Sequence, residues 1–166
     1  MTWATLSSIP VGVIVERRKA HSPWAVDLYR PVSVLHGVPA AAAGTQISHE
    51  EGVITFYAGS AVIELHRTDT TGYRDNLASG APLLWVVLRF SPSGLDLELV
   101  TADPAEGEAL TGSGNDLVES VPMPSSISKI VADFIAEHHV EQPFYKRERS
   151  KSRPAVRRVG SAKDET

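Results

Sequence analysis

The chain has 166 residues and no cysteine, which excludes disulfides, thiolate metal sites and cysteine nucleophiles. Residues 1–142 are acidic, with 8 Lys or Arg against 17 Asp or Glu, whereas residues 143–166 are basic, with 8 against 3. This length, 42% hydrophobic residues and the charge division predict a single domain over residues 1–142 and a basic, disordered tail over residues 143–166.

The N-terminal sequence bears on where the protein resides. It has neither a basic segment nor a long apolar run, so it predicts no signal peptide and no transmembrane helix. The missing cysteines suit a reducing compartment. We therefore expect a cytoplasmic protein without a membrane span.

Two strands are predicted near the N-terminus. Within residues 9–17, valines recur at every second position and share one face of an extended chain. Residues 29–38 alternate in the same way, and Pro31 near the start suits an edge strand. We expect the two strands to pair through a long loop. Residues 38–51, with four alanines before a glycine, are expected to be a loop.

Residues 53–66 predict a β-hairpin, which we expect to organise the rest of the sheet. Gly59 and Ser60 suit a two-residue type II′ turn. In that register one face of the hairpin is apolar and the other is mixed, so burial of the apolar face holds the register. The apolar face carries Ile54, Phe56, Ile63 and Leu65.

The middle of the chain predicts a short helix and a second hairpin. Tyr73 and Leu77 are four residues apart, so a helix over residues 72–78 would present both side chains on its docking face. Residues 83–90 are apolar on both faces, which is typical of a central strand. A turn containing proline and glycine then leads to a strand over residues 96–101.

The C-terminal third predicts two helices separated by a strand. An aspartate followed by a proline begins a helix over residues 103–110, and residues 116–123 form an edge strand. Residues 125–139 place isoleucine, valine and phenylalanine at helical spacing, which predicts an amphipathic helix with a serine cap at Ser125 or Ser126.

Together these elements predict an α+β domain over residues 1–142. Its antiparallel sheet has about six strands and is packed by one C-terminal amphipathic helix, over residues 125–139. A sheet curled towards a barrel is the alternative arrangement.

No pattern of residues indicates a catalytic or metal site. The six histidines lack zinc-binding spacing, and no nucleophile motif such as G-x-S-x-G occurs. We therefore predict no catalytic residue, no metal site and no bound cofactor, and we favour a non-enzymatic protein. The alternative is a small-molecule, pterin or nucleotide site at the mouth of the sheet, near His66, Tyr73 and Arg89, with or without enzymatic activity.

A few aromatic and basic residues indicate a binding surface. Trp24 is large for a loop, and Phe144, Lys146, Arg147 and Arg149 combine an aromatic ring with positive charge. We expect these residues to contact an acidic protein partner. Nucleic-acid binding by the tail is a second alternative, which long-range repulsion from the acidic body opposes.

Beyond these patterns, scattered segments together resemble a known protein family. They are residues 9–18, 23–24, 30–32, 58–59, 65–66, 73, 76–77, 86–89, 121–124, 138–140, 143–144 and 146–147. Over about residues 9–149 the chain resembles a proteobacterial family of small domains of unknown function.

The resemblance implies a biological setting. Genes of that family tend to lie beside those of molybdenum-dependent formate dehydrogenase and its accessory proteins. It therefore implies an accessory role in assembly or maturation of that system, with a formate dehydrogenase subunit or a maturation factor as the protein partner. It implies no reaction and no catalytic residue.

Overall fold

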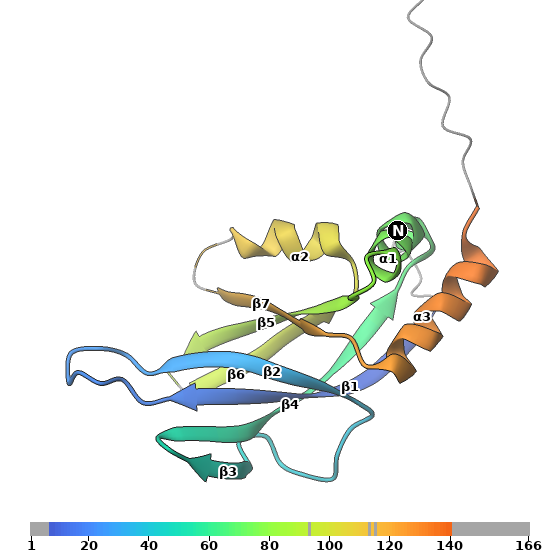
Figure 1. The fold of residues 1–166 in the computed structure, drawn as a ribbon. Helices are drawn as coiled ribbons and strands as arrows, with labels where there is room; N and C mark the ends of the chain where they lie inside the picture. Colours follow the sequence, from blue (N-terminus) through green and yellow to red (C-terminus); the bar gives the residue numbers. More distant parts are fainter. Residues whose placement is uncertain (1–6, 93, 113, 115, 141–166) are drawn as a thin grey trace, which may run out of the picture.

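The computed structural model describes residues 7–140 except residues 93, 113 and 115. They form a four-stranded sheet of order β2-β1-β4-β3, a three-stranded sheet of order β6-β5-β7 and three α-helices (Figure 1). The strands are β1 (Ser7–Arg18), β2 (Leu28–His36), β3 (Gln46–Glu50), β4 (Val53–Leu65), β5 (Leu83–Ser91), β6 (Gly94–Thr101) and β7 (Asp116–Pro122). The helical elements are the short 3-10 helix η1 (Arg67–Asp69), α1 (Thr70–Ala78), α2 (Pro104–Thr111) and α3 (Ser125–His138).

The two sheets enclose the core from opposite sides. All their strand pairs are antiparallel, which confirms the α+β class with antiparallel strands. The expected single sheet is wrong, because β1 and β5 are each flanked by their own neighbours and complete two separate sheets. Strand β4 lies beside β6, and β2 beside β7, without a shared ladder. The described strands therefore do not close a barrel.

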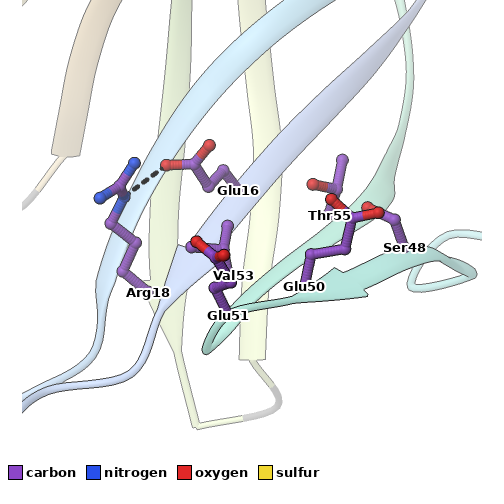
Figure 2. Close-up of a pocket in the computed structure, with 7 residues that line it drawn as sticks. All are labelled: Glu16, Arg18, Ser48, Glu50, Glu51, Val53 and Thr55. Carbon is purple, nitrogen blue, oxygen red and sulfur yellow. Dashed lines mark hydrogen bonds and ion pairs between the residues drawn. The ribbon is translucent and has the colours of Figure 1, made fainter.

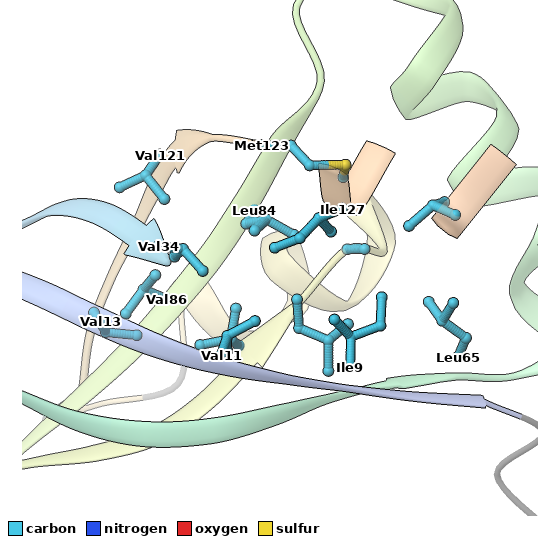
Figure 3. Close-up of a cluster of buried hydrophobic side chains, with 14 of the residues drawn as sticks. Ile9, Val11, Val13, Val34, Leu65, Leu84, Val86, Val121, Met123 and Ile127 are labelled. Carbon is cyan, nitrogen blue, oxygen red and sulfur yellow. The ribbon is translucent and has the colours of Figure 1, made fainter. Parts of the chain in front are cut away.

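The core lies between the sheets and extends to α3 (Figure 3). Alternate residues of β1 supply one wall, because successive side chains of a strand point to opposite faces. The opposite wall comes from β5 and β7, and Ile127 of α3 closes the end. The labelled side chains are Ile9, Val11, Val13, Val34, Leu65, Leu84, Val86, Val121, Met123 and Ile127.

Strand β4 corrects the predicted hairpin. Residues 53–65 run as one strand, and Gly59 lies at an irregularity in the pairing with β1 instead of in a turn. Its φ of 139° is a conformation that glycine adopts readily. Because β1 is long enough to pair with residues 53–57 and with residues 59–65, the extended arrangement satisfies both halves. The predicted apolar face is still the buried one for Ile63 and Leu65.

A second correction concerns residues 38–51, which were expected to be loop. Residues 46–50 form the short edge strand β3, paired with the beginning of β4. Because the side chains of β3 are mostly exposed, its sequence lacks the alternation of hydrophobic residues that would predict a strand. The loop before β3 lies over the outer face of β1, where a Cβ on Gly12 would meet Tyr57 and Pro39, each at 2.9 Å.

All three predicted helices are present as α1, α2 and α3, but the expectation that α3 alone packs against the strands is wrong. Helix α2 lies against β5 and β7, and α1 lies beside α3. The residues of α3 that enter the core are Ile127, Val131 and Phe134. The predicted serine cap is wrong, since Pro124 is the N-cap residue and makes no side-chain capping bond. None of the described helices is long and apolar enough to cross a membrane.

Candidate functional site

Two of the predicted cofactor-site residues, His66 and Tyr73, lie together. The backbone N–H of His66, just after β4, donates a hydrogen bond of 3.1 Å to the phenolic oxygen of Tyr73 on α1. Tyr73 is 2% exposed, and its ring makes an edge contact with Phe134 of α3. Burial raises the pKa of Tyr73 to about 12, although the hydrogen bond from His66 acts in the opposite direction. This phenol therefore joins β4, α1 and α3 and is not open to a ligand.

Arg89, the third of these residues, lies elsewhere. It is near the end of β5, six positions beyond Leu83, whose backbone meets α1. Its guanidinium donates to both carboxylate oxygens of Asp116 at 2.9 and 3.1 Å and lies 3.6 Å from Glu98. The hydrogen bond to Asp116 raises the pKa of Arg89 and lowers the pKa of Asp116. The structure thus brings His66 and Tyr73 together without Arg89, and a cofactor role for the three stays a prediction.

The Tyr73 phenol gives a test of this packing. We expect Tyr73→Phe to lower the free energy of unfolding by about 1 kcal/mol at pH 8, because the His66 N–H loses its acceptor. The folded pKa lies above the ordinary value of 10.0, so the contribution is complete below pH 10 and is lost as the pH rises towards 12. The wild type should therefore lose its advantage over the variant between pH 10 and 12 in urea unfolding. A difference in unfolding free energy between wild type and Tyr73→Phe that does not change with pH would contradict the stabilising role of the buried, protonated phenol.

Of the predicted partner-binding residues, the structure describes Trp24. It lies in the loop between β1 and β2, and this loop projects past the ends of both sheets in Figure 1. Its side chain is 93% exposed, and those of Val26 and Leu28 are 81% and 69% exposed. We call these three residues the hairpin tip. The other predicted residues, Phe144, Lys146, Arg147 and Arg149, lie outside the described residues.

The loop that carries the hairpin tip is tied down by short-range bonds. The Asp27 carboxylate accepts a hydrogen bond from the Ala20 N–H at 3.2 Å and lies 3.9 Å from Arg17. The Ala25 N–H donates to the Ser22 carbonyl at 3.1 Å. A loop held in this way presents its apolar side chains at a lower entropic cost of binding than a free segment would.

Val26 and Leu28 were missed from sequence. The signal was present, since Trp24, Val26 and Leu28 alternate along a segment that leads into a strand. Such alternation ordinarily marks a face that is buried in the same chain. Here residues 21–25 form bends and turns before β2 begins, and all three side chains meet solvent.

A second surface feature is a polar groove on the outer face of the first sheet (Figure 2). It collects three glutamates, Glu16, Glu50 and Glu51, beside Arg18. Arg18 donates a 2.7 Å hydrogen bond to Glu16, and Arg30 lies 3.6 Å from the same oxygen. These cations neutralise one carboxylate and leave the two on the β3 side facing solvent.

Histidines do not assemble a metal centre in the described part of the chain, where no group of three His, Cys, Asp or Glu side chains is placed to hold a metal ion. His139 instead lies 2.9 Å from the Thr70 hydroxyl and 3.3 Å from Arg74. It therefore links the end of α3 to α1. The imidazole ring of His138 packs against the Phe134 ring, with 4.6 Å between the ring centroids.

Comparison with known proteins gives a family assignment. A family model described as a protein of unknown function, DUF3305, matches residues 10–148. No curated protein and no solved structure matches the chain. The match confirms the sequence resemblance at the level of a domain of unknown function, and its proteobacterial and formate dehydrogenase setting stays a prediction.

Proposed function

Because the chain belongs to the DUF3305 family, whose description names no function, we propose a function from its own surface chemistry. We propose a non-enzymatic accessory protein that docks on a protein partner through the hairpin tip. The occupied surface of the partner would be an apolar pocket rimmed by carboxylates.

The observation that carries this proposal is the exposure of the hairpin tip. Trp24, Val26 and Leu28 lie close in sequence on one projecting hairpin and are each more than two-thirds exposed. Contiguous exposed apolar side chains of this size are uncommon on a monomer and often mark interaction sites. Tryptophan is also among the residues most enriched at the energetic centre of protein interfaces.

Charge supports the choice of partner. Residues 16–30 contain four Lys or Arg against two Asp or Glu, whereas the rest of residues 1–142 contains four against fifteen. The hairpin is therefore positive on an otherwise acidic body. An acidic surface would attract the hairpin and repel the remainder of the domain, which orients the two proteins as they approach.

The buried polar groups join elements of the fold. Among the described residues, every fully buried side-chain nitrogen or oxygen has a hydrogen-bond partner. Asn76 bonds to backbone groups, and Asp103 caps α2. These hydrogen bonds hold α1 and α2 against the neighbouring strands.

The proposed partner is a formate dehydrogenase subunit or one of its maturation factors. This choice rests on the sequence resemblance, which implies a role beside that molybdenum enzyme. It is consistent with a small domain that presents one exposed binding element. The direct test is binding of the purified full-length chain to each of these proteins.

We expect Trp24→Ala to weaken such a complex by about thirtyfold, since truncating a central interface tryptophan removes about 2 kcal/mol of binding free energy. Calorimetry or biolayer interferometry at moderate salt measures the change. The midpoint of thermal unfolding should not move, because the Trp24 side chain is almost wholly exposed.

Val62→Ala is the matched control. Val62 is also an exposed apolar residue, at 47% exposure, and lies on β4 towards the strand end opposite the hairpin tip. It should leave the affinity unchanged. Equal losses for the two variants, or no loss for Trp24→Ala, would contradict docking through the hairpin tip.

A further inference from the structure

We infer that a cavity between the two sheets, which we call the mouth cavity, binds a small molecule with a flat apolar body and one anionic group. This inference is independent of the hairpin tip. The cavity lies where β1 ends and β6 begins, and its volume is about 400 Å³. Its lining consists of Arg17, Tyr29, Ala43, Gly44, Gln46, Ile54, Phe56, Ala58, Gly94 and Leu95.

The volume of the mouth cavity falls within the range of small-molecule sites. Small-molecule pockets usually occupy about 300–1,000 Å³ and are lined mainly by apolar and aromatic side chains with a few polar groups. Strands of both sheets contribute lining residues, which include Phe56 from β4 and Leu95 from β6. Strands β4 and β6 lie side by side without ladder bonds, and the cavity is lined by residues of both.

Aromatic rings form the apolar wall. The Tyr29 ring makes edge contacts with Phe56, at a centroid distance of 6.4 Å, and with Phe90, at 5.3 Å. These contacts fix the ring of Tyr29 from two sides. A wall of mutually braced rings suits a planar partner, since aromatic groups prefer offset or edge-on packing against one another.

Arg17 supplies the polar recognition. Within the described residues its one ion pair is the long contact of 3.9 Å to Asp27, and its side chain is 41% exposed. The planar guanidinium has five N–H donors and pairs readily with a carboxylate or a phosphate. Gln46 on β3 adds an amide to the same lining. An anion bound in the mouth cavity would therefore contact the Arg17 guanidinium, beside the aromatic rings of the apolar wall.

The remaining wall is held in place before any ligand arrives. The Gly44 N–H donates to the Tyr57 carbonyl at 2.7 Å, and the Tyr57 N–H donates to the Thr45 carbonyl at 2.8 Å. These bonds fix the loop before β3 onto β4. A preformed wall lowers the entropic cost of binding.

The mouth cavity is not the site expected from sequence. That site was placed near His66, which follows the last residue of β4, whereas Ile54 and Phe56 lie at the beginning of β4. The two locations are at opposite ends of the same strand.

The test uses two fluorescent probes on the full-length chain. One is 8-anilinonaphthalene-1-sulfonate, which is aromatic and anionic, and the other is N-phenyl-1-naphthylamine, which lacks the sulfonate. We expect both to bind with one-to-one stoichiometry. Arg17→Gln should raise the dissociation constant of the sulfonate about tenfold, because a charge-assisted hydrogen bond is lost. It should leave the dissociation constant of the neutral probe unchanged.

Arg18→Gln is the matched control. Arg18 is the next residue of β1 and lines the groove on the outer face instead of the mouth cavity, and the substitution makes the same change in net charge. It should leave binding of both probes unchanged. A second variant, Ala43→Phe, adds a ring inside the cavity from its exposed loop and should abolish binding of both probes while the chain stays folded.

Competition then identifies the anion. Displacement of the sulfonate probe by 2-naphthoate would assign a carboxylate ligand, and stronger displacement by 2-naphthyl phosphate would assign a phosphate. Failure of both to compete would overturn the anionic class. Equal losses for Arg17→Gln and Arg18→Gln, or the absence of saturable binding of either probe, would overturn the site itself.

Discussion

Replacing Gly107 by alanine is expected to lower the free energy of unfolding by about 2 kcal/mol. Gly107 is buried in the middle of α2, and a Cβ there would overlap the Trp85 ring on β5. Forcing extra volume into a packed contact costs about 1–3 kcal/mol. Alanine favours a helix over glycine by about 1 kcal/mol, so a net loss means that the contact with Trp85 outweighs the gain. Urea unfolding followed by circular dichroism measures this change in the free energy of unfolding.

Gly112→Ala provides the comparison on the same helix. Gly112 is the residue that ends α2, its φ of −99° is allowed for alanine, and no atom lies within 4 Å of a Cβ built there. We expect its effect to stay within about 0.5 kcal/mol. If Gly107→Ala were as stable as Gly112→Ala, α2 would not be seated on the Trp85 ring.

Most elements could be predicted because their signals are local. The helix that became α2 was found from Asp103 and Pro104, and the aspartate does accept a hydrogen bond from the Ala105 N–H at 3.1 Å. The central strand β5 was found from its two apolar faces, which contact the core on one side and α2 on the other. In both cases one short segment contains all the information.

The errors arise where the outcome depends on a distant partner. Gly59 and Ser60 suit a turn locally, but β1 offers pairing positions to both sides of them, and that long-range ladder decides the matter. The short strand β3 forms because the beginning of β4 has an open edge with which it can pair. The sequence of residues 46–50 alone does not predict this pairing. Tertiary context routinely overrides local preference in strands.

The candidate sites show the same limit more sharply. Trp24 was singled out because a tryptophan is large for a loop, and its part in binding stays a prediction. The mouth cavity was not singled out, since Arg17, Tyr29 and Leu95 belong to three strands of two sheets and become neighbours only when the sheets face each other. No spacing in the sequence predicts that these residues become neighbours. The cofactor site was therefore predicted near His66 and Arg89 instead.

Asn76→Asp is expected to have the largest effect, a loss of about 4 kcal/mol at pH 7. The Asn76 amide donates to the carbonyls of Leu83, at 2.8 Å, and Ala102, at 3.0 Å, and its oxygen accepts from the Leu83 N–H at 2.9 Å. The residue is 5% exposed and ties α1 to the start of β5 and the end of β6. An aspartate of the same shape keeps the acceptor, removes both donors and buries a charge against two carbonyl oxygens.

The pH dependence separates this explanation from simple loss of packing. Burial and the facing carbonyls should raise the folded pKa of the new aspartate above its unfolded value of about 3.9. Its protonated form donates one hydrogen bond, so the deficit should be smallest below pH 4 and grow as the pH rises through the folded pKa. Asp75→Asn makes the reverse exchange on the exposed side of α1 and should stay within about 0.5 kcal/mol of wild type. A deficit that is equally large at pH 4 and pH 7 would contradict burial of a charge as the cause of the lost stability.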